Sequence, residues 1–100
     1  MFVHHVYFWL KNAGNQEEKA RLLEGIRSLG QIETIQTVHV GVPANTNRDV
    51  IDTSYTLSLL LIFNDLKDQE VYQTHPVHLK FVETCAGLWS RVVVYDSVDA

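Results

Sequence analysis

The stretch FVHHVYFWLK, Phe2–Lys11, decides the fold of this chain. Its β-branched and aromatic residues predict a strand, in which successive side chains point to opposite faces of a sheet. One face of that strand carries the apolar side chains of Phe2, Val6, Phe8 and Leu10. The other face carries Val3, His5, Tyr7 and Trp9. Because both faces are largely apolar, we expect both to be covered in the working protein.

The rest of the chain continues as alternating helical and extended patterns. Apolar spacing predicts a helix over 16–29, and extended patterns follow over 33–42 and 55–63. Two short helical pieces, over 65–72 and 76–86, precede a last strand over 89–98. This β-α-β-β-α-β order is the ferredoxin-like pattern, an α+β fold with a four-stranded antiparallel sheet and both helices on one face. One hundred residues without an internal linker or repeat form a single domain over 1–100.

Turn and capping residues set the expected boundaries of these elements. Asn15 is the expected N-cap of the first helix, Glu17 and Glu18 suit its first turn, and Gly30 is expected to end it. The polar segment 43–54 connects the second and third strands. The sequence leaves open whether this segment covers a cavity as a lid.

The other strands repeat the two-faced apolar pattern of the first. The third strand places Leu57, Leu59, Leu61 and Phe63 on one face and Leu60 and Ile62 on the other. Helices can cover one face of the sheet, but 100 residues hold nothing to cover the second. We therefore predict a homodimer in which two sheets face each other and close a dimeric α/β barrel. The alternative is a monomer with an open apolar face, and such faces usually mark interaction sites.

Composition and charge exclude several classes of protein. The net charge is −4 and the eight Lys and Arg residues are scattered, so no nucleic-acid partner is expected. Cys85 is the one cysteine, which excludes an intrachain disulfide and suits a reducing compartment. No signal peptide or membrane-spanning run is recognisable, so we expect no membrane partner and a cytoplasmic location.

The segment VYQTHPVHLKF, Val71–Phe81, holds the candidate chemistry. Pro76 disfavours helical backbone at His75 and suits the first turn of a new helix, so His75 is expected to act as a cap. At helical spacing, His78 falls beside the apolar stripe of that helix and points toward the sheet. The bend lets Tyr72 converge on the same space.

Three segments in combination resemble the stress-responsive A/B barrel family, the Dabb domain. These are HHVYFWLK at the start, THPVHLKF around Pro76 and LWSRVVVYDSV at the end, and the resemblance extends from residue 2 to about 98. It implies the fold of the wider dimeric α/β-barrel superfamily, which agrees with the dimer argued from the strands.

The family implies less about the reaction, since most members have none assigned. Its best-defined member is a plant polyketide cyclase, which closes a linear polyketide thioester by an aldol condensation without a cofactor. By residue-level match, the catalytic pair falls on Tyr72 and His78, and a strand-one pocket histidine falls on His5. A further pocket histidine falls on Leu57, so the pocket here is expected to be more apolar and its substrate different.

These residue types suit proton transfer. A histidine with an ordinary pKa of ~6.5 can take a proton near neutral pH, so His78 is the candidate general base. The hydroxyl of Tyr72 is the candidate donor to a developing enolate of an enolisable carbonyl substrate. His5 would orient His78 or hold the substrate. The residues expected to line a flat apolar cavity for an aromatic or polyketide-like ligand are Trp9, Trp89, Phe81, Phe63 and Tyr7.

Each assignment has a structural alternative. If His78 and Tyr72 serve packing alone, the protein is a non-catalytic small-ligand-binding or stress-associated dimeric module, so whether it is an enzyme stays open. His4 is expected to pack, His39 to face a surface or an interface, and Cys85 to be a small buried hydrophobe. No H-E-x-x-H pattern is present, and neither a metal nor a cofactor is expected.

Overall fold

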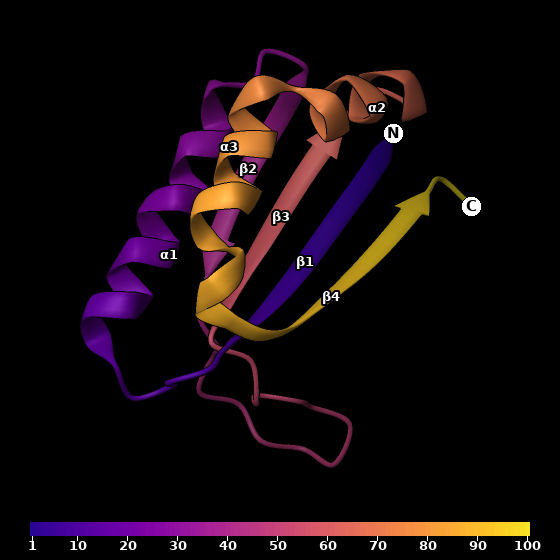
Figure 1. The fold of residues 1–100 in the computed structure, drawn as a ribbon. Helices are drawn as coiled ribbons and strands as arrows, with labels where there is room; N and C mark the ends of the chain where they lie inside the picture. Colours follow the sequence, from indigo (N-terminus) through magenta and orange to yellow (C-terminus); the bar gives the residue numbers. More distant parts are fainter.

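A computed structural model describes residues 1–100, and its elements follow the predicted β-α-β-β-α-β order (Figure 1). The strands are β1 (Phe2–Leu10), β2 (Ile35–Gly41), β3 (Leu57–Phe63) and β4 (Trp89–Val98). The helices are α1 (Gln16–Ser28), α2 (Leu66–Thr74) and α3 (Pro76–Cys85), and short 3₁₀ turns follow α1 and α3. The predicted ferredoxin-like α+β fold is therefore confirmed.

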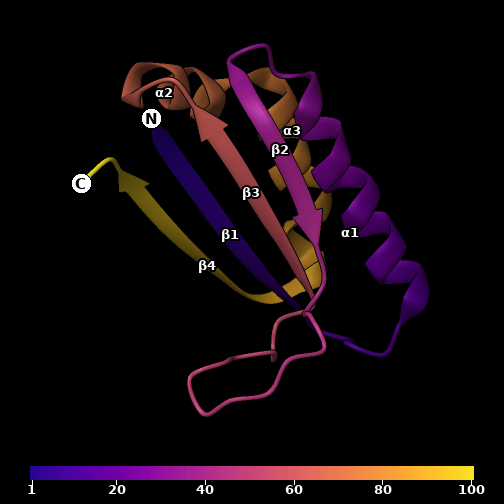
Figure 2. The same cartoon turned by 180° about the vertical axis from the view of Figure 1, so that it is seen from behind.

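The four strands form one antiparallel sheet in the order β2-β3-β1-β4. The helices lie on one face of this sheet, and the view from behind shows the strands of the other face uncovered (Figure 2). We call the uncovered side the open face. The register between β1 and its neighbours sets the site described below, because it pairs His4 with Asp96 and His5 with both Leu60 and Tyr95.

Local capping explains the ends of the first helix. The Asn15 side chain accepts a hydrogen bond from the backbone N–H of Glu18, as expected of an N-cap. The helix expected over 16–29 ends one residue earlier, at Ser28, and a 3₁₀ turn then carries the chain through Gly30 to Gln31. Tightening of the last helical turn to 3₁₀ geometry is a common way for a helix to end.

The core lies between the helices and the sheet. Alternation along β1 buries Phe2, His4, Val6, Phe8 and Leu10 against the helices and leaves the intervening side chains half-buried on the open face. The helices stop short of β4, so Val92 and Val94 on its helix-facing side stay 42% and 46% exposed. This uncovered strip is where the cavity described below opens.

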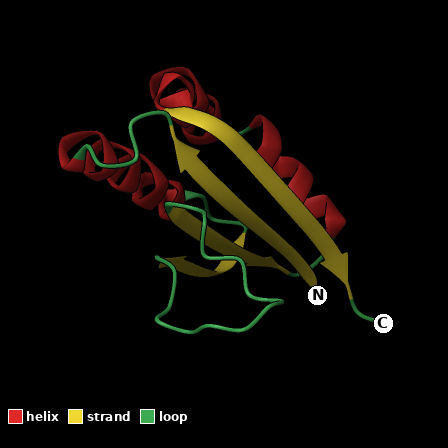
Figure 3. Cartoon of the chain, turned by 90° about the horizontal axis from the view of Figure 1, so that it is seen from below, coloured by secondary structure: helices red, strands yellow, loops and turns green.

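The loop over residues 42–56 extends from the end of the sheet on the side away from the helices (Figure 3). Its end is tied to the open face, since Trp9 Nε1 donates to Ser54 Oγ at 3.0 Å. The loop is therefore not a lid over the helix-side cavity. None of the helices has the length and hydropathy that a membrane span requires.

Candidate functional site

A cavity of about 390 Å³ lies between α3 and β4, on the helix side of the sheet. Apolar side chains form most of its wall, among them Val6, Phe8, Leu59, Phe81, Trp89 and Val94. Its polar lining consists of His4, Gln73, His78 and Asp96. The aromatic ring of Tyr72 also lines the cavity. Such an apolar cavity with a few convergent polar groups is typical of a small-molecule site.

The bend at Pro76 brings Tyr72 and His78 together. His75 has extended backbone, and its Nδ1 accepts a hydrogen bond from the backbone N–H of Val77 at 3.1 Å, so it caps α3 as expected. Tyr72 comes from the last turns of α2 and His78 from the first turn of α3, and their ring centroids lie 4.5 Å apart. The sequence therefore correctly placed these two side chains in one space.

The environment of His78 fixes its proton. Its Nδ1 lies 3.0 Å from the backbone oxygen of Gln73. Because a carbonyl only accepts, Nδ1 must carry the hydrogen, and the neutral ring then keeps Nε2 as a lone-pair acceptor. Burial lowers the pKa of His78, the bond to Gln73 raises it in part, and nearby His4 lowers it further. The ring is thus held neutral near pH 7, with one nitrogen free to take a proton.

Tyr72 has the complementary character of a donor. Its side chain is 2% exposed, and burial together with the nearby charge of Asp96 raises its pKa. The hydroxyl has no hydrogen-bond partner in the protein, yet no fully buried side-chain polar atom is left unpaired. The oxygen of Tyr72 therefore reaches accessible space in the cavity and can donate to a bound molecule.

A third group, which sequence reasoning assigned to packing, lies at the polar end of the cavity. His4 is 5% exposed, its Nδ1 donates to Asp96 Oδ1 at 2.5 Å, and its ring centroid lies 5.6 Å from that of Tyr72. Alternation could have shown this, since His4 is in phase with the more apolar face of β1. The partnership with Asp96 depends on the pairing of β1 with β4.

Three residues expected at the site lie elsewhere. His5 and Trp9 are on the open face, separated from His78 by the sheet, so His5 does not orient His78. The one-residue step from His5 to His4 changes the face, as alternation along a strand requires. Leu57 is 1% exposed in the core and does not line the cavity.

The other aromatic residues divide in the same way. Phe81 and Trp89 line the cavity, with ring centroids 5.8 Å apart. Phe63 packs behind Tyr72 at 5.4 Å and does not reach the cavity. Tyr7 lies on the open face, where its hydroxyl is 3.2 Å from His5 Nδ1. Two of the five aromatic residues expected to line the cavity therefore do so.

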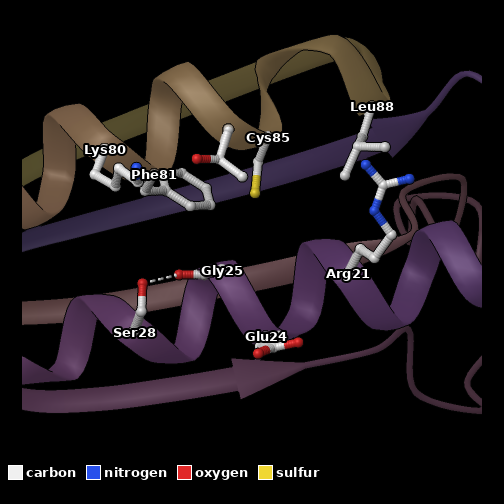
Figure 4. A pocket seen from close by; sticks show the side chains of 9 residues that line it. Arg21, Glu24, Gly25, Ser28, Lys80, Phe81, Cys85 and Leu88 are labelled. Carbon is white, nitrogen blue, oxygen red and sulfur yellow. Dashed lines mark hydrogen bonds between the residues drawn. The ribbon is translucent and has the colours of Figure 1, made fainter.

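A second hollow, of about 300 Å³, lies between α1 and α3 (Figure 4). Cys85 points into it opposite Gly25, and Arg21 lies at one end. Burial raises the pKa of Cys85, which Arg21 only partly offsets, so the thiol stays protonated and unreactive. No three His, Cys, Asp or Glu side chains gather closely enough anywhere in the chain to hold a metal ion.

Solved structures with the same fold are numerous. A Dabb family protein from Mesorhizobium loti aligns at 24% identity over 99% of this chain and 96% of its own, with a TM-score of 0.81. A hydroxynitrile lyase from Passiflora edulis aligns at 17% identity over 99% and 93%, with a TM-score of 0.80. A dimeric ferredoxin-like protein of unknown function from Bacteroides fragilis aligns at 23% identity over 96% and 93%, with a TM-score of 0.73.

At these identities the structural matches establish the fold alone. A comparison with curated proteins finds no match. The sequence profile of the Stress responsive A/B Barrel Domain, Dabb, matches residues 2–99. Since this match covers nearly the whole chain, and the resemblance read from its three segments agrees with it, the protein belongs to the stress-responsive A/B barrel (Dabb) family.

Proposed function

We propose that this protein is a cofactor-independent acid–base catalyst, of the cyclase or lyase type, that acts on an enolisable carbonyl compound. The observation that carries the proposal is the contact of a neutral His78, protonated at Nδ1, with a Tyr72 whose hydroxyl has no protein partner. The fold match to a hydroxynitrile lyase supports a lyase among the candidate reactions.

The chemistry follows from these two residues. His78 Nε2 removes a proton from the carbon next to the carbonyl, and the Gln73 carbonyl oxygen stabilises the resulting imidazolium through its bond to Nδ1–H. Tyr72 donates a hydrogen bond to the developing enolate oxygen. The enolate then attacks a second carbonyl or is reprotonated, and the proton on His78 returns to the product.

The surroundings support this division of roles. The apolar wall of the cavity keeps His78 neutral before the reaction and Tyr72 protonated throughout. The bond from Nδ1 of His4 to Asp96 fixes the ring of His4, whose centroid lies 5.6 Å from that of Tyr72. We assign His4 and Asp96 the positioning of the Tyr72 ring.

Exchange of deuterium from solvent into a carbonyl compound tests the proposal without knowledge of the natural substrate. Acetophenone and a β-keto thioester are suitable probes, followed by NMR. We expect wild type to accelerate exchange, His78→Ala to lower the rate by about 10²–10⁴-fold, and Tyr72→Phe to lower it less. Matched controls are His75→Asn and Tyr95→Phe, which lie outside the cavity and should retain the wild-type rate.

A second candidate is a non-catalytic module that binds a small apolar or aromatic ligand in the same cavity. The predominance of apolar lining over polar groups favours it. If wild type gives no exchange with either probe, while an aromatic ligand quenches Trp89 fluorescence as strongly as it does in the His78 and Tyr72 variants, the binding function replaces the catalytic one.

We also propose a homodimer through the open face, in which two sheets close a barrel. The half-buried apolar side chains of that face support it, and several structures of this fold are described as dimeric. A monomeric mass by light scattering at micromolar concentration would refute it. The free thiol of Cys85 supports a reducing compartment such as the cytoplasm.

A further inference from the structure

Two histidines that the catalytic proposal does not use share the open face. His39 on β2 and His5 on β1 both pair with Leu60 on β3, so the two imidazoles flank Leu60 in one row across the sheet. Two strand spacings separate their Cα atoms, or about 10 Å. The ring of His39 lies over Gly41, where an added Cβ would come within 3.1 Å of it.

The groups that face these histidines offer no negative charge to offset their protonation. Tyr7 on β1 and Tyr95 on β4 stand beside His5, and β3 contributes Leu60, with Ser58 and Ile62 on either side. Burial raises the pKa of Tyr7, so its hydroxyl stays neutral.

The charged groups of the open face lie toward its ends and already have partners. Arg91 stacks over the Trp9 ring at 4.5 Å, near Tyr55 and Asp52 of the loop. Asp52 accepts a bond from the Ser54 backbone N–H, and Asp99 pairs with the N-terminal ammonium. Asp96 projects to the opposite face, where it holds His4.

We propose that His5 and His39 make the homodimer pH-sensitive, so that two copies associate through the open face when both imidazoles are neutral and separate when they are protonated. The inference rests on the proposed homodimer and concerns the regulation of its interface. A second copy removes water from the open face, and an unpaired charge without water is costly there. Protons therefore bind the monomer more tightly than the dimer.

The direction of the effect follows from linkage. The pKa of His5 is already lowered in the single chain, mainly by burial and in part by the nearby His39 and His4. Burial by a second copy lowers it further. The dimer is accordingly favoured at a pH above the pKa that these histidines have in the monomer, and it is lost as the pH falls through that pKa. A histidine of ordinary pKa ~6.5 that must stay neutral weakens association about tenfold at pH ~5.5, so two such groups from each subunit give at most about 10⁴-fold. Because the pKa of His5 is already lowered in the monomer, its share of this factor is smaller.

Sedimentation velocity at about pH 8 and about pH 5.5, over a series of protein concentrations, measures the monomer–dimer dissociation constant. We expect that constant to rise by about 10²–10⁴-fold in wild type at the lower pH. The double variant His5→Gln, His39→Gln should dimerise nearly equally at both values. The matched control His75→Asn removes a histidine away from the open face and should keep the wild-type dependence.

The outcomes separate this inference from the homodimer itself. A monomer at both pH values refutes the homodimer and with it the inference. A dimer whose dissociation constant is the same at both pH values, or whose dependence persists in the double variant, overturns the inference alone. Loss of helical circular dichroism in wild type at the lower pH overturns it as well, because dissociation would then follow from unfolding.

Discussion

His78 donates a hydrogen bond from Nδ1 to the backbone oxygen of Gln73 across the Pro76 bend, at 3.0 Å. The base of the proposed catalytic pair is therefore oriented by the backbone of the preceding helix. Because α2 ends and α3 begins at this bend, the break supplies a carbonyl that a continuous helix would have used for its own hydrogen bonds.

The tautomers of two neighbouring histidines should differ. His78 donates from Nδ1, whereas His75 accepts at Nδ1 from Val77 and must carry its hydrogen on Nε2, which faces Glu33 at 3.4 Å. Long-range ¹H–¹⁵N correlation spectra near pH 8 should show the Nδ1–H form for His78 and the Nε2–H form for His75. Equal populations of the two forms in His78 would contradict its assignment as an oriented base.

The pH dependence of catalysis should carry the signature of a lowered histidine pKa. His78 acts as a base only when neutral, so kcat/KM rises with pH through the pKa of His78. Since burial lowers that pKa, the midpoint should lie below the ordinary value of ~6.5. Titration of the His78 ring by NMR should give the same midpoint. A rate that falls over this range as the pH rises would contradict the assignment of His78 as the base.

The cap of α3 should be measurable as stability. His75→Ala removes the acceptor of the Val77 N–H and should lower the free energy of unfolding by about 1 kcal/mol. His75→Asn supplies another capping side chain and should restore most of the loss. Urea unfolding followed by circular dichroism measures both. If alanine and asparagine behave alike, the cap does not contribute.

The fold and the pair of Tyr72 and His78 could be predicted because they depend on patterns among residues that are close in the sequence. Alternation in β1 and the proline bend are visible in the sequence, and they placed Tyr72 beside His78. The pairing of His4 with Asp96 joins residues 92 positions apart, and only the register of β1 against β4 creates it.

The placement of His5 failed for a related reason. The resemblance matched the family's strand-one pocket histidine to His5. Adjacent residues of a strand face opposite sides of the sheet, so an alignment that is shifted by one position selects His5 in place of His4. Both faces of the strands carry mostly apolar side chains, so the sequence does not show clearly which face the helices cover. Only the more complete apolar set of Phe2, Val6, Phe8 and Leu10 distinguishes the helix side.

The contact of α1 with α3 depends on the absence of a side chain at residue 25. A Cβ added at Gly25 would lie 2.6 Å from Cys85 Sγ and 3.1 Å from Phe81 Cδ1, so the two helices meet closely only because residue 25 has no side chain. Gly25→Ala gains helix propensity of about 0.5–1 kcal/mol, but overpacking costs about 1–3 kcal/mol. We therefore expect a net loss of stability in urea unfolding.

A double-mutant cycle identifies the cause of that loss. Cys85→Ala removes the closer of the two contacts, so the pair Gly25→Ala, Cys85→Ala should be more stable than the sum of the single effects predicts, by more than about 0.5 kcal/mol. Gly30→Ala is the matched control, since a Cβ there meets nothing within 4 Å and should show no coupling to Cys85. If the changes in the free energy of unfolding at Gly25 and Cys85 are additive, the helices accommodate the added methyl group by moving apart without loss of stability. The close approach would then not determine the packing of α1 on α3.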